Sequence, residues 1–257
     1  MTGITDAHVH VGGCMSTCFF TDHVFTGQEL VDQLDAHGVE RAIVSGGGKP
    51  HGIKSMNEMA LASIRDFPGR LVGLVRVHPL LPDWETTIDS YIGTHGFRGV
   101  KLHPTQDAYT ALDPGCHSVV EKAEELGVPV LVHSGTMPYA MPGQIADLAA
   151  AHPKAIIVMA HAGRGELYQH TVPSAARVEN LLLEFSFQLP SSVRSSIDAI
   201  GSERVMYGTN WPAVSMKPWL ETVQACRTHF SDAELQQFLG LNAERVYGVG
   251  VKGDDRA

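Results

Sequence analysis

A strand-like stretch near the N-terminus reads Ile4-Thr5-Asp6-Ala7-His8-Val9-His10-Val11. Alternate side chains of a β-strand lie on the same face, so His8 and His10 point the same way and can hold one metal ion between them. Two ordinary histidines on a solvated edge strand would give the same pattern. The remainder of the chain decides between these two interpretations.

Size and composition are those of an ordinary globular protein. The chain has 257 residues, of which 44% are hydrophobic and 18% charged, enough for a substantial core. Its 28 acidic residues outnumber 19 basic residues, and the formal net charge is -9. No cluster of Lys and Arg opposes this charge locally, so binding to nucleic acid is not expected.

The cysteines indicate a protein of the reducing cytoplasm, because no two of them form a C-x-x-C pair. The four are Cys14, Cys18, Cys116 and Cys226. The first two follow the histidine pair, where ordinary loop or buried thiols are commoner than a lining of the site. No apolar run approaches the roughly 20 residues that cross a bilayer, so no association with a membrane is expected.

Short apolar runs rich in Val, Ile and Leu alternate with helical patterns along the chain, which is typical of βα units around a parallel sheet. Eight runs are predicted to be strands: 4–10, 41–46, 71–77, 97–102, 129–133, 155–160, 181–187 and 204–208. Eight βα units in roughly 250 residues match the size of a (β/α)8 TIM barrel. We therefore predict a single α/β barrel domain over residues 1–257.

An open, doubly wound sheet has the same alternation of elements but binds its ligand beside a glycine-rich turn. The nearest such turn is Gly46-Gly47-Gly48-Lys49, which lacks both the P-loop spacing and the G-x-G-x-x-G pattern. We interpret it as a flexible loop over the site and prefer the barrel.

Capping residues predict where several helices begin and end. Ser55 to Glu58 and Ser231 to Glu234 fit the S-x-x-E capping box at a helix start. Gly38, Gly127 and Gly240 stand where a helix end favours a left-handed residue.

Histidines gather at the ends of the predicted strands. Of 14 histidines, six fall at a carboxyl end: His8, His10, His78, His103, His133 and His161. Strand ends that are distant in sequence converge on one mouth of a barrel, where barrel active sites are built. One such histidine is commonly a satisfied core residue, whereas six at equivalent positions predict a clustered metal or catalytic site.

At these positions the chain resembles the amidohydrolase superfamily, in the amidohydrolase-related branch that also contains metal-dependent aromatic decarboxylases, hydratases and lactonases. The resemblance covers nearly the whole chain. Its carriers are Asp6-Ala7-His8-Val9-His10, Gly99-Val100-Lys101-Leu102-His103-Pro104, Val130-Leu131-Val132-His133-Ser134-Gly135, Met159-Ala160-His161-Ala162-Gly163, Val205-Met206-Tyr207-Gly208-Thr209-Asn210-Trp211-Pro212 and Asn242-Ala243-Glu244-Arg245-Val246-Tyr247-Gly248.

The resemblance implies one divalent metal ion ligated by His8, His10 and His133, with His161 as an acid/base or substrate-polarising residue. Three neutral imidazoles leave the ion its charge and an open position, so it can acidify a water molecule and polarise a carbonyl. Zinc fits histidine ligands best, with manganese, cobalt and iron as alternatives. Asp6 either orients a ligand histidine or makes a structural hydrogen bond.

Asn210 is the main departure from the pattern. The family's strand-eight motif has an Asp there that contacts the metal and moves protons. The Asn210 amide keeps the shape and its oxygen can still ligate the metal, but it is not a base. A variant with different chemistry, a substitution that traps substrate and a protein that binds without turnover all remain open. His161 or Glu184 would be the base instead, although the pattern of 181–187 does not fix which way Glu184 faces.

Lys101 allows a second metal interpretation. A strand-four lysine is carbamylated to bridge two metals in binuclear relatives, but the sequence Lys101-Leu102-His103-Pro104 resembles the mononuclear branch. We therefore expect one metal and a substrate-binding role for Lys101 and His103.

Cationic residues near the strand ends favour a small carboxylated substrate. The expected substrate-binding residues are Arg76, His78, Lys101, His103, Arg164 and Trp211. Alternatively, Arg76 forms a structural ion pair, Arg164 starts a helix in solvent and Trp211 packs above the barrel.

Three functions stay open. The first is a metal-dependent hydrolase acting on an ester, lactone or amide. The second is a metal-dependent, non-oxidative decarboxylase of an aromatic or unsaturated acid. The well-known decarboxylases of the branch carry inserted loops for which this chain has little room, which favours hydrolysis. The third is a non-catalytic protein that retains a metal ion. Asn210 is the only feature of the sequence that supports it. The resemblance also implies a homodimer.

Overall fold

The structure, a computed structural model, describes residues 3–13, 23–48 and 52–249, so Cys14, Cys18 and Lys49 lie outside the described residues. Its strands are β1 (Ile4–Gly13), β2 (Val24–Phe25), β3 (Val39–Gly47), β4 (Leu71–Arg76), β5 (Gly99–Leu102), β6 (Val130–Val132), β7 (Ile157–Met159), β8 (Leu181–Glu184) and β9 (Val205–Met206). All eight predicted strands are present. The structure adds β2, which pairs antiparallel with β1.

The strands form one sheet in the order β2-β1-β3-β4-β5-β6-β7-β8-β9, parallel from β1 through β9. Backbone hydrogen bonds join its two ends. Ala7 N donates to Tyr207 O at 2.9 Å, Asn210 N to His8 O at 2.7 Å and His10 N to Trp211 O at 2.7 Å. The sheet therefore closes on itself, which confirms the predicted (β/α)8 barrel.

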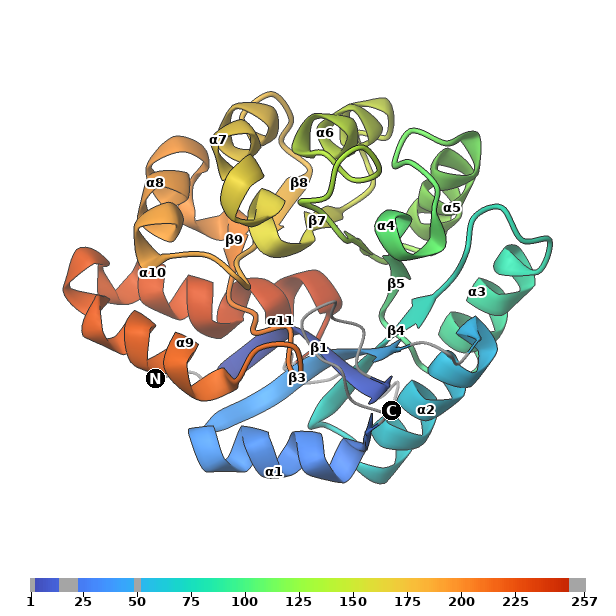
Figure 1. Cartoon of the computed structure of the whole chain (residues 1–257), viewed down its shortest axis with the longest axis horizontal. Coiled ribbons are helices and arrows are strands. Elements are labelled where there is room, and N and C mark those ends of the chain that lie inside the picture. The colour runs from blue at the N-terminus through green and yellow to red at the C-terminus, as the bar shows by residue number, and fades with distance from the viewer. Residues whose placement is uncertain (1–2, 14–22, 49–51, 250–257) are drawn as a thin grey trace.

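Helices surround the curled sheet (Figure 1). They are α1 (Gly27–His37), α2 (Ile53–Asp66), α3 (Trp84–Gly93), α4 (Pro104–Asp107), α5 (Pro114–Glu125), α6 (Pro142–Ala151), α7 (Arg164–Ala175), α8 (Pro190–Ile200), α9 (Met216–Ala225), α10 (Asp232–Gln236) and α11 (Asn242–Tyr247), with short turns η1 (Ala160–Gly163), η2 (Ser202–Arg204), η3 (Arg227–His229) and η4 (Gln237–Leu241). Among the described helices, none is long and apolar enough to pass through a bilayer.

Three predicted helix ends hold and two do not. The Ser231 capping box starts α10, and Gly38 ends α1 in the left-handed conformation. Gly127, with a φ of +66°, follows the end of α5. Ser55 lies inside α2, which begins at Ile53, so that capping box is wrong. Gly240 lies within η4; a Cβ there would stand 2.6 Å from the Gly3 carbonyl oxygen, so close approach to β1 accounts for this glycine.

The glycine-rich segment after the second predicted strand is also corrected. Gly46 and Gly47 belong to β3 and are not loop residues. A Cβ on Gly46 would meet the Met56 carbonyl oxygen at 2.0 Å, so glycine lets α2 approach the strand.

Alternation along the strands separates two apolar layers. The larger layer, between sheet and helices, takes Leu181 and Leu183 of β8, while the barrel interior takes Leu182. Because side chains alternate, Glu184 shares the inward face of Leu182. The same alternation turns Lys101 inward, since both of its neighbours in β5 pack in the larger layer.

The barrel interior is closed at one end by α11. Ala243, Val246 and Tyr247 of this helix pack with the inward-facing apolar residues of the strands. The carboxyl ends of the strands carry the polar groups described next.

Candidate active site

His8 and His10 lie on β1, and each ring has two polar partners. His8 Nδ1 is 2.8 Å from Glu184 Oε2, and its Nε2 is 3.0 Å from Lys101 Nζ. His10 Nε2 is 3.0 Å from Asn210 Oδ1, and its Nδ1 is 3.0 Å from the Ser45 hydroxyl. Both rings belong to the barrel mouth and not to a solvated edge strand.

His133 and His161 come from the ends of β6 and β7. His161 Nε2 lies 3.1 Å from His133 Nδ1, and His161 Nδ1 lies 2.6 Å from the Ser186 hydroxyl. The His133 ring stacks on His103 with centroids 3.9 Å apart, and the rings of His161 and His8 lie 4.9 Å apart. Four strand ends thus bring their imidazoles into one cluster.

Burial keeps these imidazoles neutral. It lowers the pKa of His10 to about 3 and holds the pKa values of His8, His133 and His161 well below the ordinary value of 6.5. The nearby positive charge of Lys101 acts in the same direction on all four. A neutral ring carries one lone pair for a metal ion.

Glu184, the last residue of β8, is fully buried beneath the cluster. One carboxylate oxygen accepts from His8 Nδ1, from His161 N at 3.1 Å and from the Ser186 hydroxyl at 3.0 Å, and the other accepts from Ser186 N at 2.5 Å. Burial raises its pKa to about 7, although these hydrogen bonds oppose the increase. Neighbouring Gly208 leaves room for the carboxyl, since a Cβ there would stand 2.3 Å from it.

Asp6 has a structural role. Its carboxylate accepts from His8 N at 3.0 Å, from Thr209 N at 3.1 Å and from the Thr209 hydroxyl at 2.6 Å. It therefore ties β1 to the segment after β9. The carboxylate that contacts the His8 ring is that of Glu184.

Backbone strain is concentrated at the same strand ends. Five of the six described non-glycine residues with positive φ follow β7, β8 or β9: His161, Ala162, Arg164, Phe187 and Asn210. Such conformations persist where the surrounding structure enforces them, and they collect at functional sites.

Two cations of the mouth are buried. Arg76, at the end of β4, forms an ion pair of 2.8 Å with Asp107, and only 1% of its side chain is exposed. Lys101 is equally buried, and burial lowers its pKa to about 7 while the charge of Glu184 acts against that change.

Arg164 stands apart from these two. Its guanidinium carbon lies 4.6 Å from the centroid of the Phe187 ring, which itself lies 5.2 Å from the His161 ring. No ion pair joins Arg164 to a side chain in the described part of the chain. A cation–π contact holds the guanidinium by its face and leaves its N–H edges for a ligand.

His78 and Trp211 lie farther from the clustered nitrogens. The His78 ring packs 5.2 Å from Tyr109, whose hydroxyl accepts from His103 N. Trp211 packs edge to face on Phe25, with centroids 5.3 Å apart. The structure gives neither side chain a direct contact with the imidazoles of His8, His10, His133 or His161 among the described contacts.

Some residues of the mouth were not anticipated from the sequence. Ser45 lies opposite His10 in the register of β1 and β3, and knowledge of that register would have found it. Ser186 and Phe187 follow a strand end but belong to residue types that carry no metal or base signal by themselves. Asp107 lies at the end of α4 and not directly after a strand.

The residues present fit a divalent metal ion. The buried groups His8, His161 and Glu184 place ligand atoms within 4.8 Å of one another. Of the predicted ligands His8, His10 and His133, only His8 belongs to this group. The 3.0 Å between His10 Nε2 and Asn210 Oδ1 is the separation of two neighbouring ligands that each lie about 2.0–2.2 Å from one ion. Lys101 Nζ lies 3.0 Å from His8 Nε2.

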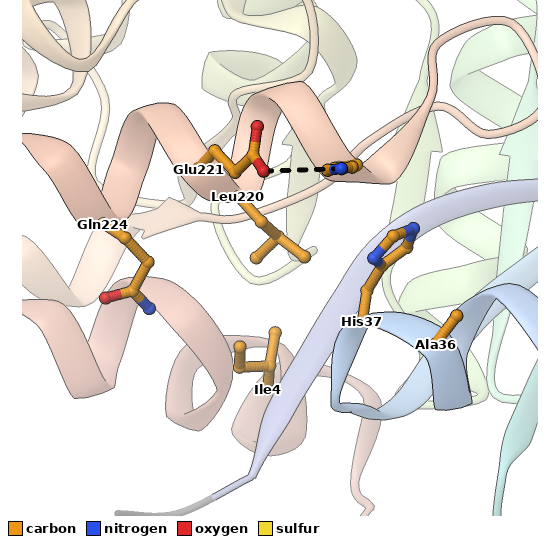
Figure 2. A pocket seen from close by; sticks show the side chains of 7 residues that line it. Ile4, Ala36, His37, Leu220, Glu221 and Gln224 are labelled. Carbon is orange, nitrogen blue, oxygen red and sulfur yellow. Dashed lines mark ion pairs between the residues drawn. The ribbon is translucent and has the colours of Figure 1, made fainter.

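A cavity of about 470 Å³ lies away from this cluster. It opens beside the first residue of β1, between α1 and α9. Figure 2 shows its lining residues, including Ile4, Ala36, His37, Leu220, Glu221 and Gln224. An ion pair joins Lys217 and Glu221 across 3.8 Å on α9. The cavity has no gathering of imidazoles comparable to the barrel mouth.

Solved structures share the fold over almost their whole lengths. A 2,6-dihydroxybenzoate decarboxylase in complex with 2,6-dihydroxybenzoate has a TM-score of 0.76 at 17% identity, covering 97% of this chain and 100% of that one. A 5-carboxyvanillate decarboxylase from Novosphingobium aromaticivorans, complexed with manganese and a nitrobenzoic acid, has a TM-score of 0.75 at 14% identity, covering 96% of each chain.

A probable 2-pyrone-4,6-dicarboxylic acid hydrolase from Acinetobacter baumannii has a TM-score of 0.71 at 18% identity, covering 96% of this chain and 100% of that one. A search of curated proteins found no match. The family model described as Amidohydrolase matches residues 28–249, which include every strand end of the cluster except β1. The chain is therefore an enzyme of the amidohydrolase family, built on a TIM barrel.

Proposed function

We propose that this enzyme is a metal-dependent hydrolase that acts on an ester, lactone or amide carbonyl of a small carboxylated molecule. The observation that carries the proposal is the cluster of buried, neutral imidazoles from β1, β6 and β7 at the mouth of the barrel. Neutral imidazoles are the ligands that zinc prefers, and we propose zinc as the ion.

His8, His10 and His133 would hold the ion, with the Asn210 amide oxygen beside His10. A divalent ion there supplies Lewis-acid polarisation of a carbonyl and acidification of water. Glu184 orients His8 through the 2.8 Å contact with Nδ1, as a carboxylate behind a ligand histidine commonly does.

His161 is the proposed acid/base group. Burial holds its pKa well below the ordinary value, so the ring is neutral and keeps a lone pair, although it is a weak base. Asn210 cannot accept a proton, because an amide has no basic lone pair near neutral pH.

Arg164 is the proposed anchor for the substrate carboxylate. Its guanidinium lies against Phe187, next to His161, which places a positive charge beside the reacting region. The charges of Arg76 and Lys101 add to a local positive potential, although the chain as a whole is negative.

Decarboxylation of an aromatic acid is the second candidate. The likeness to 2,6-dihydroxybenzoate decarboxylase covers 97% of this chain and 100% of that one, so chain length does not argue against this reaction. Both reactions would use the same ion and the same carboxylate anchor.

The test is to load the protein with zinc or manganese and incubate it with carboxylated lactones and hydroxybenzoic acids. Hydrolysis in ¹⁸O-labelled water places the label in the product, whereas decarboxylation releases carbon dioxide without it. Labelled hydroxy acid from a lactone supports the proposal. Carbon dioxide release alone favours the second candidate, and no metal-dependent turnover of either class contradicts both.

We also propose a cytoplasmic location and a small-molecule substrate. The two described cysteines, Cys116 and Cys226, are both free thiols, as expected of a reducing compartment.

A further inference from the structure

We propose that Glu184 and Ser186 are positioning residues that fix which ring nitrogen carries the proton in His8, His161 and His133. The inference deepens the proposed function, because it states how ligand lone pairs are presented to a metal ion. It concerns a chain of hydrogen bonds inside the protein and is measurable without metal and without substrate.

The hydrogen bonds start at the Glu184 carboxyl, whose two oxygens accept the backbone N–H groups of His161 and Ser186. Above its pKa of about 7 this group is ionised and only accepts. His8 Nδ1 lies 2.8 Å from it and must therefore carry the proton of that ring. A neutral imidazole has one N–H, so His8 Nε2 is left with its lone pair.

Ser186 links Glu184 to His161 and so determines which His161 nitrogen carries the proton. The Ser186 hydroxyl has one proton and donates it to Glu184 Oε2 at 3.0 Å. Its oxygen is then an acceptor for His161 Nδ1, which lies 2.6 Å away and must carry the proton of that ring. His161 Nε2 is left as an acceptor.

His133 completes the sequence. Its Nδ1 lies 3.1 Å from the bare Nε2 of His161, so His133 Nδ1 carries a proton and donates it. The lone pair of His133 is thereby placed on Nε2. Two imidazoles from β1 and β6 thus present the same nitrogen, and both assignments trace back to one carboxylate at the end of β8.

Lys101 Nζ lies 3.0 Å from His8 Nε2 and can donate to its lone pair, so it does not compete with Glu184 for His8 Nδ1. Glu184 Oε2 lies 3.9 Å from His161 Nδ1, beyond hydrogen-bond distance, so Ser186 is the link between them. The backbone fixes the pair as well, because Ser186 N donates to Glu184 and His161 N donates to the same carboxylate.

The arrangement predicts different results for the two residues. Ser186→Ala removes the acceptor of His161 Nδ1–H, so His161 shifts toward the Nε2–H form. His133 then loses its acceptor and shifts toward Nε2–H as well. His8 is unchanged, because it bonds Glu184 directly. Glu184→Gln changes all three rings.

The experiment is ¹⁵N NMR of the histidine rings in chelator-treated, metal-free protein, where protonated and bare ring nitrogens have separate resonances. Parent protein is expected to show Nδ1–H in His8, His161 and His133. Ser186→Ala is expected to change only His161 and His133, and Ser186→Thr, which keeps the hydroxyl, to restore them. Ser196→Ala, another fully buried serine that contacts Tyr168, is the control for loss of a buried hydroxyl.

Zinc affinity is the second readout. Ser186→Ala is expected to weaken binding by about 10-fold to 100-fold, the usual effect of losing a group that orients a ligand histidine. Nε2–H in His161 or His133 of the parent protein overturns the inference, as do unchanged tautomers in Ser186→Ala. Correct tautomers in a protein that turns over no substrate leave the inference standing and contradict the proposed function alone.

Discussion

Replacing Asn210 by Asp is expected to raise turnover by about 100-fold to 10,000-fold, because it supplies a carboxylate base at the mouth of the barrel. The substitution adds a negative charge and changes the shape of the side chain very little. Asn210 has a φ of +59°, a conformation that Asn and Asp adopt more readily than other residues with a Cβ. The backbone therefore accepts either residue.

The size of the effect follows from the position of the side chain. Asn210 Oδ1 lies 3.0 Å from His10 Nε2, among the proposed metal ligands, so a carboxylate there stands within reach of a reacting proton. The expected gain equals about 2.7 to 5.4 kcal/mol of activation free energy, at 1.36 kcal/mol for each factor of ten. The added charge also attracts a divalent cation, so metal affinity rises with it.

The assay compares kcat of the parent protein, Asn210→Asp and Asn210→Ala at saturating metal, with the substrate identified in the ¹⁸O experiment. Asn210→Ala removes the amide without adding a base, so it separates a gain in basicity from a simple loss of the amide. Equal kcat in the parent protein and Asn210→Asp would refute the reasoning, as would an equal gain in Asn210→Ala.

Three further outcomes are expected. Lys101→Met should tighten zinc binding at pH 7, because it removes the amine that lies 3.0 Å from His8 Nε2, and titration calorimetry showing weaker binding would contradict this. Arg164→Gln should raise KM for a carboxylated substrate by about 10-fold to 100-fold with little change in kcat, the effect of losing a charge-assisted hydrogen bond of about 1.5–3 kcal/mol; an equal change for an uncharged analogue would argue against an anchoring role. Glu234→Gln should destabilise the fold by about 1 kcal/mol at pH 7, because the carboxylate caps α10 and pairs with Arg194 at 3.0 Å. Arg194 and the capping bonds lower the pKa of the Glu234 carboxyl to about 2, so its contribution to stability is complete above the ordinary value of 4.5 and is lost as the pH falls through 2. Urea unfolding at pH 7 and pH 2.5 should therefore show a smaller difference in unfolding free energy between parent and variant at the lower pH. A difference of equal size at both pH values would contradict the assignment.

The barrel could be predicted because each strand carries its own signal. A buried parallel strand is a short run of apolar residues between helical patterns, and eight such runs set the architecture without any knowledge of contacts. β2 was missed because Val24–Phe25 is too short for a periodic signal, and its pairing with β1 depends on tertiary structure.

The site was predictable only in part, because its chemistry depends on which side chains meet. The histidines could be identified from the sequence, because their residue type and their position after a strand both indicate a site. Glu184 does not, since Leu181 to Leu183 are apolar on both faces and hide the alternation that turns its carboxyl inward. Ser186 has the least signal of all, because a hydroxyl gains its role from the 2.6 Å contact with His161.

The hydrogen bonds that close the barrel explain why a substitution at residue 210 can alter the chemistry of the site without altering the fold. Asn210 is held by its backbone, which donates to the His8 carbonyl, while the next residue, Trp211, accepts from His10 N. These bonds join the strand that carries two ligand histidines to the segment that carries Asn210, and no side-chain atom of residue 210 takes part in them. The carboxylate of Asp6 strengthens the same junction through Thr209. The amide is therefore free to be exchanged for a carboxylate on a fixed backbone, and the difference in charge is the variable that the Asn210→Asp comparison measures.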